Sequence, residues 1–334
     1  MKYTYLLATA LAFFSCSRTP EIIKNVSVGT ALGTSYSLIY LSDRPLDFQR
    51  EIDSVFAAVN RSLSTYIPTS DISKINRGDS TLVVDAMFRD VFRISKEVHE
   101  KTDGYFDPTV GVLVDAWGFG PGKQMQLDST RVDSLLDYVG FEKIRLTDRN
   151  TIKKANPDIH LDFNAIAKGY AIDRLARLMD ARGIRDYLLE VGGEVVAKGT
   201  NRIKKKRWVV GIDDPQMGEI RELKTRIYLK DRALASSGNY RKFRMDPITG
   251  EKYVHTVDPK TGFTKNANTL GATVLADTCA KADAYATAFM AMDLDDALKL
   301  LTAQREIDAY IIYLDEQGET REFMTEGFQA LVVE

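Results

Sequence analysis

The sequence predicts an α+β fold: mixed, largely antiparallel sheets with packed helices. Two observations carry this prediction. Segments with the apolar period of a helix occur in several parts of the chain, and groups of strand-like segments follow one another directly between them. A doubly wound parallel sheet would place a helix after almost every strand, so it is disfavoured.

Strand-like segments are those in which apolar and polar residues alternate or β-branched residues gather. The first covers residues 25–40, where Gly29 and Gly33 suggest a bend or bulge. The others cover residues 144–147, 159–163, 187–191, 195–199, 208–212, 226–229 and 253–257. Residues 308–313 and a final strand predict a terminal hairpin.

Helical segments are those whose apolar residues fall on one face at a period near 3.6. They cover residues 46–63, 85–101, 165–182, 278–292 and 295–303. Ser70 is expected to cap a short turn that runs through Asn76, and Gly183 is expected to end the helix over 165–182.

The N-terminus has the pattern of an export signal. A positive charge at Lys2 is followed by an apolar run from Tyr5 to Phe14, which is shorter than the ~20 residues that span a membrane. Residues 1–15 are therefore predicted to be a signal peptide. Cys16 directly follows a small residue, which indicates lipidation there; a plain signal peptide with an incidental cysteine is the alternative.

These features predict an exported protein, lipid-anchored to the periplasmic face of a bacterial inner membrane. Residues 16–24 would form the lipid-anchored linker, and the rest of the chain is long enough for one large domain or two closely packed ones. The net charge of −2 gives no reason to expect a nucleic-acid partner. Cys279, the only other cysteine, is expected to be a buried helix residue without redox function.

Several common catalytic motifs are absent from the sequence. It contains no Gly-x-x-x-x-Gly-Lys-Ser/Thr loop and no Gly-x-Ser-x-Gly turn, and its three histidines are too scattered for a zinc cluster. The glycine-rich segment 118–122 follows no predicted strand and is a weak dinucleotide fingerprint. The remaining candidates are polar clusters at the ends of predicted elements.

The first cluster covers residues 162–170, where a strand is expected to end and a helix to begin. A helix N-terminus presents free N–H groups, which suit phosphate oxygens, and Lys168 adds a positive charge. Asp162 or Asn164 could alternatively be the cap of the helix. A cap alone does not explain a cation in the first turn, where it opposes the helix dipole.

The second cluster is the pair Asp283 and Thr287. The two residues stand at i and i+4, so both oxygens point from one helix face. A carboxylate with a hydroxyl suits Mg²⁺ or Ca²⁺, although an ordinary polar face remains the alternative.

The third cluster covers residues 255–262, in which Asp258 and Gly262 are explained by a turn. His255 precedes that turn and is a candidate general base or phosphate ligand. Two glycine motifs, at residues 192–194 and 236–240, suit close approach of the backbone to a bulky ligand.

Taken together, these segments resemble the ApbE family, the FAD:protein FMN transferases. The matching pieces, in chain order, are residues 32–34, 63–66, 104–108, 162–169, 192–193, 237–240, 255–262 and 282–287. Their order and spacing extend from about residue 25 to the end of the chain. The resemblance implies an ApbE-like architecture related to the T-fold, with residues 25–334 as the catalytic domain.

The resemblance also implies roles for individual residues. FAD would be contacted by Leu32, Tyr66, Tyr105, Phe106, Asp107, Asp162, Lys168 and Val257. Mg²⁺ would be bound by the backbone carbonyl of Ala165 together with Asp283 and Thr287, and His255 would be catalytic. Leu32 stands where the family usually has methionine, and Ala286 where some members have an acidic metal ligand.

The implied activity is Mg²⁺-dependent transfer of FMN from FAD to a threonine or serine hydroxyl of a target protein, with formation of a phosphoester and release of AMP. The acceptor would be a membrane redox subunit that bears a Thr/Ser flavinylation motif. Two alternatives stay open: an FAD pyrophosphatase that gives FMN and AMP, and a non-catalytic FAD-binding lipoprotein.

Overall fold

A computed structural model of the chain describes residues 21–215, 222–238, 243–245, 252–265 and 268–333. The predicted signal peptide and the predicted lipidation site at Cys16 lie outside these residues. Of the predicted linker, only residues 21–24 lie within them. The first strand begins at Ile23, two residues before the predicted start of the domain. Within the described residues, no helix is both long and apolar enough to cross a membrane.

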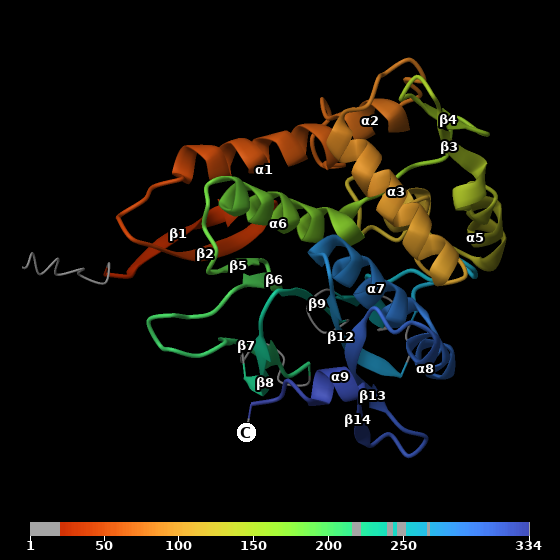
Figure 1. Cartoon of the computed structure of the whole chain (residues 1–334). Coiled ribbons are helices and arrows are strands. Elements are labelled where there is room, and N and C mark those ends of the chain that lie inside the picture. The colour runs from red at the N-terminus through yellow and green to blue at the C-terminus, as the bar shows by residue number, and fades with distance from the viewer. Residues whose placement is uncertain (1–20, 216–221, 239–242, 246–251, 266–267, 334) are drawn as a thin grey trace, which may run out of the picture.

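An eight-stranded sheet forms the centre of the fold (Figure 1). Every pair of neighbours in it is antiparallel, which confirms the predicted α+β class. In sheet order the strands are β1 (Ile23–Ala31), β2 (Thr34–Ser42), β5 (Tyr187–Val191), β6 (Glu194–Lys198), β9 (Arg232–Gly238), β12 (Thr269–Ala276), β13 (Asp308–Leu314) and β14 (Thr320–Met324). The last two form the predicted terminal hairpin.

Three further strand pairs lie outside this sheet, and each is antiparallel. They are β3 (Ile144–Leu146) with β4 (Ile152–Lys154), β7 (Trp208–Asp213) with β8 (Leu223–Leu229), and β10 (Phe243–Met245) with β11 (Lys252–Val254). β11 ends at Val254, directly before His255, whereas the sequence predicted a strand over residues 253–257 that includes His255.

Helices gather mainly on one face of the sheet (Figure 1). The longer ones are α1 (Gln49–Leu63), α3 (Ala86–Lys101), α6 (Asn164–Ala181), α7 (Cys279–Ala291) and α8 (Leu294–Ala303). The shorter ones are α2 (Asp71–Asn76), α4 (Gly111–Ala116), α5 (Ser129–Leu136), α9 (Glu326–Gln329) and the 3₁₀ turn η1 (Phe141–Lys143). Ser70 caps α2 as predicted, because its hydroxyl accepts the N–H of Ser73 at 3.2 Å.

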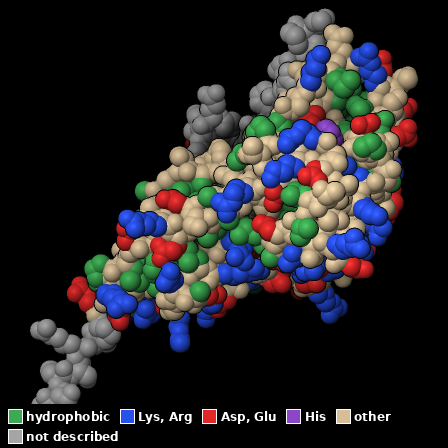
Figure 2. Space-filling model, turned by 90° about the horizontal axis from the view of Figure 1, so that it is seen from above, with side chains coloured by type: hydrophobic (Ala, Val, Ile, Leu, Met, Phe, Trp, Pro, Cys, Tyr) green, Lys and Arg blue, Asp and Glu red, His purple; other side chains and the backbone are tan. Residues whose placement is uncertain are grey.

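The two faces of the sheet belong to two apolar cores. Because side chains alternate along a strand, Val274 of β12 joins the core under the helices, whereas the next residue, Leu275, joins the core beneath β7, β8 and α9. In β9, Ala233 likewise joins the core under the helices, and Leu234 joins the core on the other face of the sheet. The outer surface seen in Figure 2 carries basic and acidic side chains interspersed with one another.

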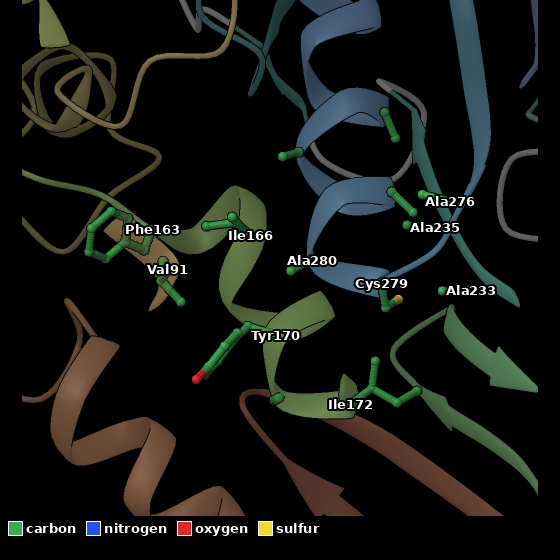
Figure 3. Packing of buried hydrophobic residues seen from close by; sticks show 14 of the residues in the cluster. Val91, Phe163, Ile166, Tyr170, Ile172, Ala233, Ala235, Ala276, Cys279 and Ala280 are labelled. Atoms are coloured by element: carbon green, nitrogen blue, oxygen red, sulfur yellow. The ribbon is translucent and has the colours of Figure 1, made fainter. Parts of the chain in front are cut away.

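The helices α6 and α7 cross in close contact on the face of the sheet that the helices cover (Figure 1; Figure 3). A Cβ atom placed on Gly169 of α6 would lie 2.4 Å from the carbonyl oxygen of Cys279, so only glycine fits there. Asp173, one turn further along α6, accepts the N–H groups of Cys279 and Ala280 at 2.8 and 2.9 Å. The first turn of α7 is therefore capped by a carboxylate of α6.

Most predicted elements are confirmed with small shifts of their ends, but the strand predicted at 159–163 is wrong. Only His160 makes an isolated bridge there. The amide and carbonyl of Leu161 bind the side chain of Asn76 at 2.8 and 2.9 Å, and the amide of Asp162 binds the Pro108 carbonyl at 2.7 Å. The end of α2 and the loop at Pro108 therefore satisfy the backbone groups that a sheet would have used.

The sequence analysis missed β9 and β12, two central strands of the sheet. β9 reads Arg-Ala-Leu-Ala-Ser-Ser-Gly, and β12 contains Gly271 and two alanines. Such small residues have weak strand propensity by themselves. They suit this position because α7 packs closely over both strands, which leaves little room for larger side chains.

Replacing Gly169 by alanine tests the helix crossing. The added methyl group would force α6 from the backbone of α7, so we expect Gly169→Ala to lower the free energy of unfolding by about 1–3 kcal/mol. Urea unfolding followed by circular dichroism measures the change. Gly271→Ala is the matched control, because a Cβ there meets nothing closer than 3.6 Å. Equal stability of the two variants would contradict the proposed close crossing.

Candidate functional site

The first turn of α6 forms the centre of the candidate site. Asp162 lies just before the helix, and its Oδ1 accepts the amide N–H of Asn164 at 2.7 Å. Asn164 in turn donates from Nδ2 to the hydroxyl of Thr65 at 3.3 Å. Burial raises the pKa of Asp162 to about 6 although the Asn164 amide opposes it. Asp162 thus fixes the turn that leads into the helix. This role is close to that of a helix cap, which was the alternative interpretation of Asp162 from the sequence.

Lys168 lies among carboxylates rather than in open solvent. Its ammonium pairs with Glu194 at the start of β6. Burial alone lowers the pKa of Lys168, but Asp283 and Glu194 outweigh this effect and raise it above the ordinary value. One ammonium therefore faces two carboxylates, and the cluster carries an excess of negative charge when all three groups are ionised.

Asp283 of α7 reaches the second turn of α6. Its Oδ2 accepts the amide N–H of Gly169 at 3.1 Å. Burial raises the pKa of Asp283 to about 7, although Lys168 lowers it. In an α-helix the amide of Gly169 points at the carbonyl of Ala165, so the Asp283 carboxylate approaches α6 beside that carbonyl.

Thr287 is the third predicted ligand. It lies one turn along α7 from Asp283, so the two side chains leave the same helix face, and it is partly exposed. The predicted ligands Ala165, Asp283 and Thr287 are thus associated with one helix crossing. Among the described residues no group of three His, Cys, Asp or Glu side chains could hold a metal ion, and the donors at this crossing are instead of mixed type.

Two tight turns lie next to each other beside the cluster. Leu32 occupies the β1–β2 turn with a φ of 52°. Gly192 occupies the β5–β6 turn, and its amide donates to the carbonyl of Ser35 at 3.0 Å. A Cβ on Gly192 would meet the side chain of Thr34 at 2.7 Å. The predicted FAD contact at Leu32 therefore shares a neighbourhood with the strand that carries Glu194.

Tyr66, Phe119 and His255 form a second group near Asp162. The Tyr66 side chain is 57% exposed, and its hydroxyl donates to the carbonyl of Phe119 at 3.4 Å. Burial, followed by the charges of Asp162 and Asp115, raises the pKa of Tyr66. The rings of Phe119 and His255 meet edge to face, with centroids 6.5 Å apart.

The segment 105–107 contributes one accessible ring and two buried residues. Lys260 lies over the Tyr105 ring, 4.1 Å from its centroid. Phe106 is buried in the core. Both carboxylate oxygens of Asp107 accept protein N–H or O–H groups, from Thr109 at 2.8 and 2.6 Å and from the Phe141 amide at 3.0 Å. The structure gives Asp107 a structural role, and its FAD contact stays a prediction.

Val257 is also buried. It forms an isolated bridge with Thr264 and packs with Leu113 and Val139. Of the predicted glycine motifs, Ser237 and Gly238 end β9, whereas Asn239 and Tyr240 lie outside the described residues. The structure thus brings Lys168 and Asp283 together, with Thr287 one turn along α7. It also places Tyr66 near Asp162 and, through Phe119, near His255.

The sequence analysis did not identify Glu194, Asp115 and Asp173 as parts of this region. Glu194 was noted only as the end of a glycine motif, although its position directly after two glycines was a usable signal. Asp115 receives the amide of Gly122 at 2.8 Å, and so organises the glycine-rich segment 118–122. Asp173 lies inside a regular helix, where no local pattern reveals that it caps another helix.

The fold and the site define an α+β protein with a buried, mixed-charge site where the first turn of one helix meets a second helix. The sequence model of the ApbE family matches residues 32–311. The chain belongs to the ApbE family.

Two relatives called FAD:protein FMN transferase are similar over nearly their whole lengths. The protein from Haemophilus influenzae is 30% identical over 325 residues, which cover 93% of this chain and 92% of the relative. The protein from Vibrio cholerae is 31% identical over 332 residues, which cover 97% and 96%.

Solved structures give the same result for the fold. The flavin transferase ApbE from Vibrio cholerae superposes with a TM-score of 0.82 at 29% identity, over 93% of this chain and 100% of that one. The ApbE protein from Thermotoga maritima superposes with a TM-score of 0.81 at 26% identity, with the same coverage. The ApbE-like architecture expected from the sequence is therefore confirmed.

The raised pKa of Asp283 predicts how stability changes with pH in the metal-free protein. Because its folded-state pKa is about 7 and the ordinary value is 3.8, the folded state holds a proton that the unfolded state releases. Asp283 therefore contributes stability at low pH that is lost as the pH rises through 7. We expect wild type to lose about 1 kcal/mol relative to Asp283→Asn between pH 6 and 8.

Urea unfolding of both proteins in EDTA at several pH values measures this difference. Asp296→Asn on α8, whose carboxylate pairs with Lys299 at the surface, is the control and should follow wild type. A constant difference between wild type and Asp283→Asn across this range would show that Asp283 does not titrate there.

Proposed function

We propose that this chain is an enzyme that transfers FMN from FAD to a threonine or serine hydroxyl of a target protein, forming a phosphoester and releasing AMP. The relatives named FAD:protein FMN transferase support this assignment because they match almost the whole chain. The observation that carries it is the meeting of Lys168, Asp283 and the first turn of α6. This meeting suits a pyrophosphate with its counter-ions.

The pyrophosphate of FAD would lie at the first turn of α6. Free amide groups at a helix N-terminus and the ammonium of Lys168 both attract phosphate oxygens. Leu32, in the neighbouring turn, and Tyr66, with its exposed ring, would contact the flavin nucleotide. Tyr105, Phe106, Asp107, Asp162 and Val257 complete the proposed FAD contacts.

A magnesium ion fits the residues at the helix crossing. Hard cations prefer oxygen ligands, and the Ala165 carbonyl, Asp283 and Thr287 would supply them. When Asp283 is ionised, the cluster of Lys168, Glu194 and Asp283 carries an excess negative charge that a cation would offset. When bound, Mg²⁺ would neutralise charge on the pyrophosphate oxygens.

The chain's own residues would position and deprotonate the acceptor. The acceptor hydroxyl oxygen would attack the phosphorus on the FMN side, and the bond from that phosphorus to the bridging oxygen would break, so that AMP leaves. His255 would take the hydroxyl proton, which makes it the proposed general base. Its place beside Phe119, whose carbonyl binds Tyr66, supports this role.

The base assignment predicts that His255→Ala retains FAD binding and loses transfer. General bases contribute about 10²–10⁴-fold, so a loss of at least about 100-fold in rate is expected. Purified protein would be mixed with FAD, Mg²⁺ and an acceptor domain that bears a flavinylation motif. Mass spectrometry then follows FMN on the acceptor hydroxyl.

The same assay separates the alternative activities. Free FMN and AMP without acceptor labelling would favour hydrolysis, and bound, unchanged FAD would favour a carrier. An undiminished transfer rate in His255→Ala would remove His255 from the mechanism.

The metal assignment predicts that Asp283→Ala abolishes the Mg²⁺ dependence of transfer. Removing the buried carboxylate takes away the only charged ligand proposed for the ion, so residual activity should be the same with Mg²⁺ and with EDTA. Asp296→Ala, at the surface of α8, is the matched control and should respond to Mg²⁺ as wild type does. Full Mg²⁺ stimulation of Asp283→Ala would place the metal elsewhere.

We also propose that the enzyme is exported and lipid-anchored through Cys16 at the periplasmic face of the inner membrane, with a membrane redox subunit as acceptor. The short apolar run and the cysteine after Ser15 support this proposal. Cells fed a clickable fatty acid should label wild type and leave Cys16→Ser unlabelled. Equal labelling of both proteins would exclude acylation at Cys16.

A further inference from the structure

Glu194 is a buried carboxylate beside the proposed cation ligands, and the chemistry above gives it no task. It is 2% exposed. Its Oε1 pairs with the Lys168 ammonium, while Oε2 is buried and has no hydrogen-bond partner in the described part of the chain. A buried acceptor without a donor costs about 1–3 kcal/mol. The Glu194 carboxylate is therefore held by one partner, Lys168, and by the backbone that carries it.

The turn before Glu194 holds its backbone in place. Gly192 and Gly193 have φ values of 63° and 104°, which favour glycine. The amide of Gly193 donates to Oε1 of Glu190 at 2.7 Å, and that of Gly192 donates to the Ser35 carbonyl at 3.0 Å. Two strands thus fix the residue that begins β6, and the Glu194 carboxylate is directed at Lys168.

Lys168 stands near two carboxylates and pairs with one of them. Both Asp283 and Glu194 act on the ammonium electrostatically. Within the described residues, however, the ion pair is formed with Glu194, and none is formed with Asp283. Asp283 instead accepts the Gly169 amide through Oδ2, and no donor from the described residues reaches its Oδ1. Within the part of the chain that the structure describes, this oxygen is open to a further ligand.

We propose that Glu194 is a positioning residue, whose carboxylate holds the Lys168 ammonium away from Asp283 and keeps Asp283 open to a divalent cation. The proposal rests on the proposed function, because the cation belongs to it. Lysine has a long, flexible stem with a compact charge. Without Glu194 the ammonium would turn to Asp283 and compete with the cation.

A double-mutant cycle on cation binding tests this role without measuring catalysis. Mg²⁺ would be titrated by calorimetry into the full chain saturated with ADP, whose diphosphate stands in for the pyrophosphate of FAD. We expect Glu194→Gln to weaken Mg²⁺ binding by about tenfold or more, as loss of a group that orients metal ligands does. In the Lys168→Met background the same change should cost less than about threefold, because the competing ammonium is gone.

The controls separate failure of this proposal from failure of the proposed function. Glu51→Gln removes a surface carboxylate that pairs with Arg182, and should bind Mg²⁺ like wild type. An equal effect of Glu194→Gln in both backgrounds would show that Glu194 acts on the metal directly, and would overturn the positioning role. Wild type that binds no Mg²⁺ would instead overturn the metal assignment itself. Circular dichroism of each variant confirms that it is folded.

Discussion

The close crossing of α6 and α7 is the constraint on which the rest of the site depends. Gly169 lets the two helix backbones touch, and Asp173 ties the first turn of α7 to α6. The crossing then brings Asp283 to the second turn of α6, where its carboxylate accepts the Gly169 amide N–H. A single methyl group at Gly169 would disturb the fold and the proposed cation site together.

The crossing also explains why charged groups are tolerated inside the molecule. Desolvation opposes the charge of both Asp283 and Lys168, and each offsets part of that cost for the other. Glu194 adds a second carboxylate, so the cluster carries more negative than positive charge when Asp283 is ionised. A structural ion pair would be closer to neutral. A cluster that needs a cation is consistent with a protein whose substrate arrives with a divalent metal.

Patterns that are local in sequence predicted the local parts of the site. Asp283 and Thr287 lie on one helix and another helix begins at Asn164, as predicted. His255 instead follows a strand that was predicted to include it. Features that depend on contacts between residues far apart in the chain were not predicted. β9 and β12 were missed because their small residues have weak strand propensity by themselves, and the covering helix α7 is far away in the sequence. The strand expected near Leu161 was wrong because the side chain of Asn76 binds the amide and the carbonyl of Leu161.

The central claim is that the α6–α7 crossing holds the cation and the pyrophosphate of FAD. The most direct test is a crystal structure of the protein with FAD and Mn²⁺, in which anomalous scattering locates the metal. The account predicts one strong peak at about 2.1–2.2 Å from oxygens of Asp283, Thr287 and the Ala165 carbonyl, with the FAD phosphates at the first turn of α6. A metal peak elsewhere, or phosphates away from that turn, would contradict it.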